Sequence, residues 1–204
     1  MGKIKLTKGA LKSQRDALRR YERYLPILLL KKQQLQLEIL RQFSLLEDRK
    51  AKEGDNAGSA RAWAGLLTDD SVDIKSWARP EKVIRTTKNI AGIDFPVFER
   101  AEFKRPAYDL FTMPLWVDAA LEALQTLISL KEEIKTLEEG IDLLRRELRI
   151  TAQRVNLFEK IKIPESEEAI RVIKIFIGDQ MANAVGRSKI AKRKISEEFA
   201  GKTA

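Results

Sequence analysis

The chain has 204 residues, of which 34% are charged and 44% hydrophobic, and it holds only ten Gly and six Pro, a balance that favours helix over sheet. It contains no cysteine and no histidine, which excludes disulfides, zinc–thiolate sites and thiol nucleophiles and removes the commonest general base. The net charge is +9, and no apolar run approaches the ~18 residues that span a bilayer. We therefore expect a cytoplasmic chain with no cofactor.

The first predicted element is a long helix that Thr7 can cap. Steps of three and four residues pass through a largely apolar set, which is Leu11, Gln14, Leu18, Tyr21, Leu25, Leu28, Lys32, Leu35, Ile39, Gln42 and Leu46. This spacing is typical of one face of a coiled-coil helix. Pro26 should kink the helix, and the stretch from Gly54 to Gly58 should introduce a bend or loop. The helix should end before Pro80.

The chain then changes character, because β-branched and aromatic residues fill the stretch from Val83 to Phe103. This pattern predicts a small β-hairpin. A two-stranded hairpin is only marginally stable alone, so it should rest on the adjacent helices or on a partner. Trp77, Phe103 and Trp116 could supply part of that surface.

The second predicted helix begins near Met113 or Pro114 and runs to about Lys160. Its apolar stripe is longer and purer than the first and comprises Ala120, Ala123, Leu127, Leu130, Ile134, Leu137, Ile141, Leu144, Leu148, Thr151, Val155 and Phe158. Pro164 should interrupt the helix, which should resume after a kink and end near Glu198.

These elements predict a mostly α fold, a long antiparallel two-helix coiled coil with a small β-hairpin insertion at the middle of the chain. We expect a single elongated domain over residues 1–204. It would consist of an N-terminal helix arm (1–78), a β-hairpin region (79–112) and a C-terminal helix arm (113–204).

Basic residues gather near both ends of the chain. The N-terminal cluster includes Lys3, Lys5, Lys8 and Lys12, and the C-terminal cluster is Arg187, Lys189, Lys192, Arg193 and Lys194. An antiparallel fold would bring the two clusters to one end. They could simply complement helix dipoles and keep the protein in solution, or they could face an acidic partner. The sequence leaves both interpretations open.

Adjacent carboxylates are the remaining candidates for chemistry, and they occur at Glu132–Glu133, Glu138–Glu139 and Glu167–Glu168. Neighbours on a helix point about 100° apart, so these pairs are expected to be solvated charges beside the apolar stripe. We predict no catalytic residue and no metal ligand.

Three segments resemble those of one protein family. The segment in the predicted hairpin is Asn89, Ile90, Ala91, Gly92, Ile93, Asp94, Phe95 and Pro96. The segment in the second helix is Thr151, Ala152, Gln153, Arg154, Val155, Asn156, Leu157, Phe158 and Glu159, followed by Ile163 and Pro164. The segment in the first helix is Leu28, Leu29, Leu30, Lys31, Lys32 and Gln33. These segments, and the order of helix, hairpin, helix and basic tail, are similar to those of the D subunits of V-type and A-type rotary ATPases. That family supplies the central rotor shaft.

The resemblance implies a non-catalytic subunit that couples ATP hydrolysis or synthesis in a hexamer of A and B subunits to proton or sodium transport through a membrane ring. The basic end, with both terminal clusters, would enter the hexamer. The small F subunit of the rotor and a funnel-shaped subunit on the ring would bind elsewhere, with apolar anchors among Phe95, Phe98, Phe103, Phe111 and Trp116. The chain would be peripheral on the cytoplasmic face, meeting the membrane only through the complex.

Two other interpretations fit parts of the pattern. A coiled-coil stalk of a type III secretion or flagellar export ATPase would share the helical hairpin, although the segment from Asn89 to Pro96 is not expected there. A nucleic-acid-binding coiled coil would explain the basic ends, but few aromatic residues are interleaved with them.

Overall fold

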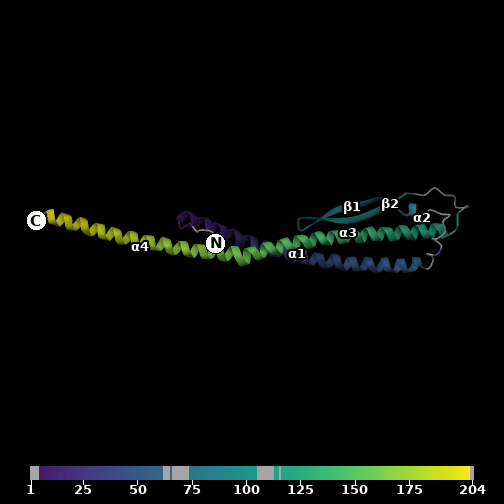
Figure 1. Ribbon diagram of the computed structural model, residues 1–204, viewed down its shortest axis with the longest axis horizontal. Helices are drawn as coiled ribbons and strands as arrows, with labels where there is room; N and C mark the ends of the chain where they lie inside the picture. Colours follow the sequence, from purple (N-terminus) through teal and green to yellow (C-terminus); the bar gives the residue numbers. More distant parts are fainter. Residues whose placement is uncertain (1–4, 62–64, 66–73, 105–112, 115, 203–204) are drawn as a thin grey trace. The chain divides into compact units, whose positions relative to one another are not determined.

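The computed structural model describes residues 5–61, 65, 74–104, 113–114 and 116–202. Its elements in chain order (Figure 1) are α1 (Lys8–Arg61), α2 (Ile74–Trp77), β1 (Pro80–Ile90), β2 (Ile93–Phe103), α3 (Trp116–Leu157), the π-helical turn η2 (Phe158–Lys162) and α4 (Ile163–Lys202). The contacts between residues divide the chain into two compact units. One combines Met1–Leu30 with Ala152–Ala204, and the other is Lys31–Thr151.

Within Lys31–Thr151, α1 and α3 lie side by side and run antiparallel. Lys31 pairs with Glu147 at 2.9 Å, and Arg49 pairs with Glu133 at 2.9 Å. As the residue number increases along α1, the number of the paired residue on α3 therefore decreases. This arrangement confirms the predicted fold class, two long helices in contact with an antiparallel hairpin between them in sequence.

The core of this unit is built from the two predicted stripes and the hairpin. Its buried members are Leu35, Ile39, Leu46, Phe95, Ile134, Leu137, Ile141 and Leu144. Leu35 and Leu144 are wholly shielded from solvent. Burying a leucine side chain contributes about 1.5–3 kcal/mol, so the stripes hold the two helices together largely by the hydrophobic effect.

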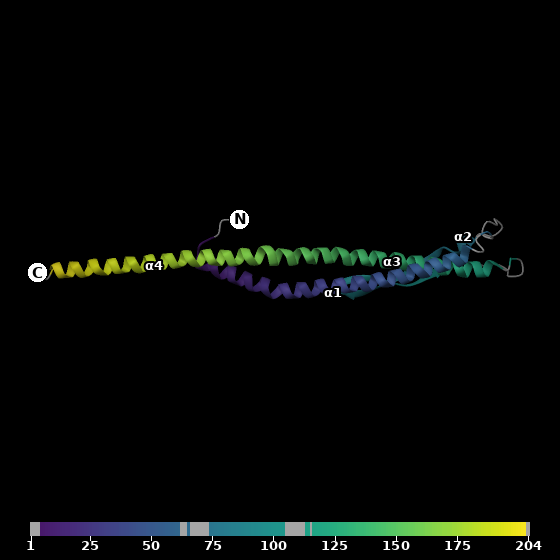
Figure 2. The same cartoon turned by 90° about the horizontal axis from the view of Figure 1, so that it is seen from below.

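In the other unit the same two helical arms also pack on each other. The rings of Tyr21 and Phe158 lie 5.1 Å apart between centroids. Val155, Ile170 and Ile173 are buried along the C-terminal arm. Beyond this contact region, every described side chain from 178 to 197 is exposed, and α4 continues as a single helix (Figure 2).

The expected bend or loop between Gly54 and Gly58 is wrong, because α1 runs without a break to Arg61. A glycine inside a helix costs only about 1 kcal/mol relative to alanine, and the neighbouring residues are not helix breakers. Pro26 also lies inside α1. The predicted stop before Pro80 follows the separate four-residue helix α2 rather than the long helix.

The C-terminal arm differs from prediction around Pro164. The helix does not stop and restart there; α3 passes through the π turn η2 directly into α4, which extends to Lys202. Inside this turn the N–H of Ile163 donates to the carbonyl of Phe158, five residues back. The wider turn keeps the arm helical up to a proline that cannot donate its own backbone hydrogen bond.

Candidate partner-binding surfaces

The C-terminal basic cluster lies wholly on the solvent-exposed part of α4. Each of its members, which are Arg187, Lys189, Lys192, Arg193 and Lys194, is exposed. The ion pair found for them is Arg193 with Glu197, at 3.6 Å and well exposed. An exposed pair of this kind contributes little, so the cluster keeps its positive charge available to a partner.

One residue of each basic cluster lines a shallow depression between the start of α1 and α4. Lys8, at the start of α1, and Arg187 both line it, together with Phe176 and Met181 of α4. Thr7 caps α1 as predicted, with its hydroxyl accepting from the N–H of Ala10 at 3.1 Å. Lys5 and Lys12 are also exposed, whereas Lys3 falls outside the described residues.

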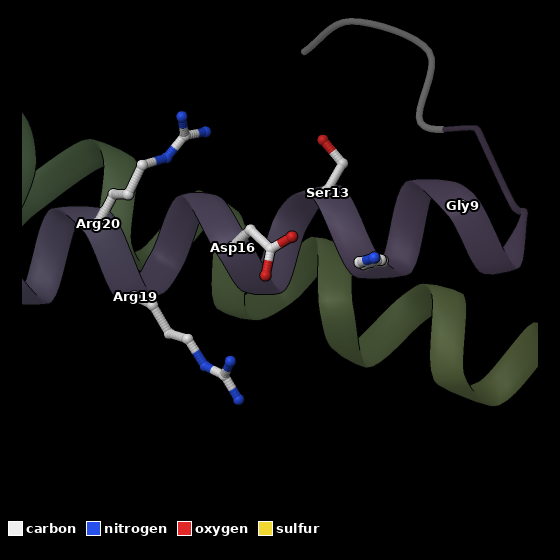
Figure 3. A pocket seen from close by; sticks show the side chains of 6 residues that line it. Gly9, Ser13, Asp16, Arg19 and Arg20 are labelled. Carbon is white, nitrogen blue, oxygen red and sulfur yellow. The ribbon is translucent and has the colours of Figure 1, made fainter.

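A second hollow lies further along α1, lined by Gly9, Lys12, Ser13, Asp16, Arg19 and Arg20. Figure 3 shows the Arg19 and Arg20 side chains pointing to different sides of the helix, with the Asp16 carboxylate between Arg19 and Ser13. The guanidinium groups therefore do not converge on one point. This surface is a broad basic face that suits an extended acidic partner rather than a small anion.

Exposed apolar residues accompany these basic ones on α4. Met181, Val185, Ile190 and Ile195 are each more than half exposed. The helix around them buries no side chain against any other described part of the chain. Since an isolated helix in water gains little from its apolar side chains, this segment is suited to burial in a partner.

The hairpin turn explains why Asn89 and Gly92 occur together in the family-like segment. Ala91 and Gly92 form a two-residue loop with φ of 51° and 82°, values typical of the tight turns that join antiparallel strands. The Asn89 side chain accepts from the Gly92 N–H at 3.1 Å and donates to the Asp94 carboxylate at 3.1 Å. Two strands of 11 residues each, with Thr87 opposite Pro96, extend from this turn.

The hairpin is anchored on α3 by one apolar contact and one charged one. The ring of Phe95 is only 2% exposed and lies directly over Gly140, where a Cβ would come within 2.5 Å of it. Arg85 reaches Glu139 at 2.9 Å and Glu132 at 3.5 Å. The adjacent carboxylates of α3 are thus occupied in ion pairs that hold the hairpin and α1.

The predicted aromatic anchors therefore occupy different environments. Phe95 is buried in the core of the chain, whereas Phe98, Phe103 and Trp116 are half-buried. Phe111 falls outside the described residues. In the segment from Thr151 to Pro164, Val155 is buried, and four of the predicted positions are exposed, namely Gln153, Arg154, Asn156 and Pro164.

Sequence reasoning missed an exposed apolar pair on α1. Leu37 and Leu40 are 59% and 66% exposed. Leu37 also borders a groove formed with Arg41 and with Ile90 and Ala91 of the hairpin turn. The sequence signal for this pair is the three-residue spacing of leucines on the helix face opposite the buried stripe. A pattern search that follows one apolar stripe does not detect it.

Among the described residues, acidic side chains form no cluster of three or more that could hold a metal ion. No described helix combines the length and apolar character that a membrane crossing requires. The candidate surfaces of the described residues are charged or apolar faces of the helices and of the hairpin turn. Two long helices in contact that carry exposed charged and apolar faces are typical of a subunit in a protein assembly.

Comparison with known proteins agrees with this class. A family model for the D subunit of ATP synthase matches residues 10–193. The chain is 44% identical over 197 residues to the V-type ATP synthase D subunit of Borreliella burgdorferi, covering 94% of this chain and 95% of that one. It is 35% identical to the protein of the same name from Chlamydia caviae, with 95% and 94% coverage, and 32% identical to that of Chlamydia trachomatis, with 95% and 97% coverage. The chain belongs to the family of V-type ATP synthase D subunits.

Proposed function

We propose that the chain is the central rotor-stalk subunit of a V-type ATP synthase, a non-catalytic shaft that couples nucleotide turnover to ion transport. The observation that carries this proposal is the single, exposed and basic C-terminal part of α4. An asymmetric shaft inside a ring of nucleotide-binding subunits favours a different conformation at each site according to its angle. Turning the shaft then shifts those conformations in sequence, and torque and nucleotide affinity are linked reciprocally.

The basic residues would face acidic loops of the ring formed by the A and B subunits. Long-range attraction between charges changes smoothly with angle, whereas apolar knobs seated in pockets would resist rotation. The exposed apolar residues of α4, such as Val185 and Ile190, would add contact area without a fixed ion-pair register.

Charge reversal tests this proposal. Replacing the five basic residues of the C-terminal cluster by glutamate should uncouple ATP hydrolysis from ion transport in membrane vesicles that carry the complex. A matched control reverses five exposed basic residues of α3 that are distant in sequence from the cluster, namely Lys131, Lys135, Arg145, Arg146 and Arg149. Unchanged coupling in the cluster variant, or equal loss in the control, would contradict the assignment.

We also propose that the surface with Leu37, Leu40 and the hairpin turn binds the small F subunit of the rotor. Two adjacent, more than half-exposed leucines beside a groove provide the apolar centre that a stable interface needs. The part of α1 and α3 nearest Arg61 and Trp116 would face the funnel-shaped subunit on the membrane ring.

The Leu37→Asp and Leu40→Asp double variant should lose the small rotor subunit in a tagged pull-down while retaining the nucleotide-binding subunits. Both side chains are exposed, so the thermal midpoint of the free chain should be unchanged. The control is Leu45→Asp, at a less exposed position (36%). Retention of the small subunit by the double variant would place its site elsewhere.

A further inference from the structure

The apolar stripe of the C-terminal arm changes phase by one residue at the π turn. Before the turn, Val155 and Phe158 are three residues apart; after it, Ser166, Ile170 and Ile173 follow at intervals of four and three and are buried. From Phe158 to Ile163, the next half-buried apolar residue, the interval is five. A coiled-coil stripe advances by three or four residues, so η2 accommodates one residue in excess.

The segment η2 could also hold the excess residue in an ordinary α-helical turn. If η2 became α-helical, α4 would turn by about 100° around its own axis. The stripe facing α1 would then continue the spacing of Phe158 through Lys162 and Glu165 to Ala169, Val172 and Phe176. The last three are apolar and at least partly buried already. Two neighbouring apolar stripes therefore lie side by side on α4.

The proline that follows the turn lowers the cost of such an exchange. Pro164 has no N–H, so one carbonyl of the preceding turn lacks a helical donor in either geometry. The side chains of the turn, such as Glu159, Lys160 and Ile161, are exposed and would not have to leave a core. The register shown is favoured because its stripe holds isoleucines where the alternative holds Lys162, Ala169 and Val172.

We propose that η2 is a register joint, at which α4 exchanges between the stripe of Ile170 and Ile173 and the stripe of Ala169 and Val172 by converting a π turn to an α turn. In the proposed function, on which this role rests, such a joint lets one end of the shaft turn about its axis without unfolding. Packed helices that offer two discrete arrangements respond in steps rather than by continuous deformation.

Cysteine labelling tests the exchange in the free chain of 204 residues, which contains no natural cysteine. Ile173 and Leu144 are both 0% exposed, so I173C and L144C form a matched pair. If the register exchanges, a maleimide should label I173C at least about tenfold faster than L144C under native conditions. Equal rates would overturn the proposal.

Deleting Lys160 removes the spare residue and leaves Ile170 and Ile173 in phase with Phe158. In that background I173C should label as slowly as L144C, whereas K160A, which keeps the length, should leave I173C fast. Fast labelling in the deletion background would mean that fraying of α1 exposes the site, and would overturn the proposal. Deletion of Ile161 shortens the interval from Phe158 to Ile163 in the same way. It replaces the Lys160 deletion if that variant does not fold.

The role in coupling has a separate readout. In the assembled complex, deletion of Lys160 should lower ATP-driven ion transport at least about twofold, because the variant lacks the turning step that the proposed joint provides. Pull-down should still show normal assembly. Unchanged transport would exclude the joint from coupling. Failure of the natural chain to assemble would instead contradict the proposed function and leave the labelling result intact.

Discussion

At the residue scale, the contact between Phe95 and Gly140 shows how one missing side chain positions an element. The ring occupies the space that a Cβ at position 140 would fill. Glycine in a helix interior is normally unfavourable because it loses backbone entropy on folding. Here the cost is offset by burial of a phenylalanine that belongs to the hairpin, so a local helix preference is overridden by tertiary packing.

Gly140→Ala should therefore destabilise the chain by about 1–3 kcal/mol, since the added methyl group must displace the ring or the hairpin. Gly178→Ala is the matched control. It also lies inside a helix, but a Cβ there meets no atom within 4 Å, so it should stabilise by about 0.5–1 kcal/mol. Urea denaturation followed by circular dichroism measures both, and equal effects of the two substitutions would refute the packing argument.

This contact also marks a limit of sequence reasoning. The positions of Phe95 and Gly140 are far apart in the chain, and nothing in the local pattern of either indicates that they meet. The Asn89–Gly92 turn, by contrast, is predictable because its chemistry is local: a side chain bonds a backbone N–H three residues on.

At the element scale, the hairpin depends on α3 for its stability. Two-stranded sheets are marginal alone, and this one adds ion pairs from Arg85 to Glu132 and Glu139. The Arg85 side chain is 33% exposed, so screening by solvent limits the contribution of each pair.

Arg85→Met should loosen the hairpin by about 0.5–1 kcal/mol, seen as faster amide hydrogen exchange in β2 with little change in α3. High salt should produce part of the same effect in the natural chain, because it screens the pairs. Arg100→Met is the control, since Arg100 pairs with Glu102 inside β2 and both are exposed. Faster exchange in the control alone would contradict this account.

The helices themselves are the most predictable elements, because a spacing of three and four repeated over many turns has one simple structural solution. Their interruptions are harder to predict. Gly54 and Gly58 suggest a break, yet the helix continues through both, because each glycine costs a helix only about 1 kcal/mol relative to alanine. The five-residue interval from Phe158 to Ile163 is visible in the sequence, but Pro164 beside it suggests a kink rather than a π turn.

At the scale of the whole molecule, the buried side chains that stabilise the fold and the exposed side chains of the last part of α4 lie on different stretches. Among the described side chains, buried residues lie on α1, on and just after α2, on the hairpin, on α3 and on the first part of α4, and the last of them is Ile173. Described side chains from 178 to 197 are exposed. This part of α4 adds surface for a partner but almost nothing to the fold of the chain alone.

Truncation after Val185 should therefore shift the thermal midpoint of the free chain by less than about 2 °C. The same truncation should abolish recovery of the nucleotide-binding subunits in a pull-down, because the C-terminal basic cluster is removed. Truncation after Glu168, which also removes the buried Ile170 and Ile173, provides the comparison and should lower the midpoint clearly. A large shift from the truncation after Val185 would show that the segment contributes to folding.

The exposed end of α4 also makes the resistance of the chain to proteolysis depend on whether it is bound to its partners. A helix without tertiary contacts opens readily in water. Beyond the depression that Arg187 lines, Lys189, Lys192 and Lys194 are exposed and would be accessible to proteases that cut after basic residues. Newly made copies outside a complex would lose this segment first, and in the proposed function such copies could no longer assemble. Degradation of unassembled copies would then keep the number of these subunits matched to the number of complexes.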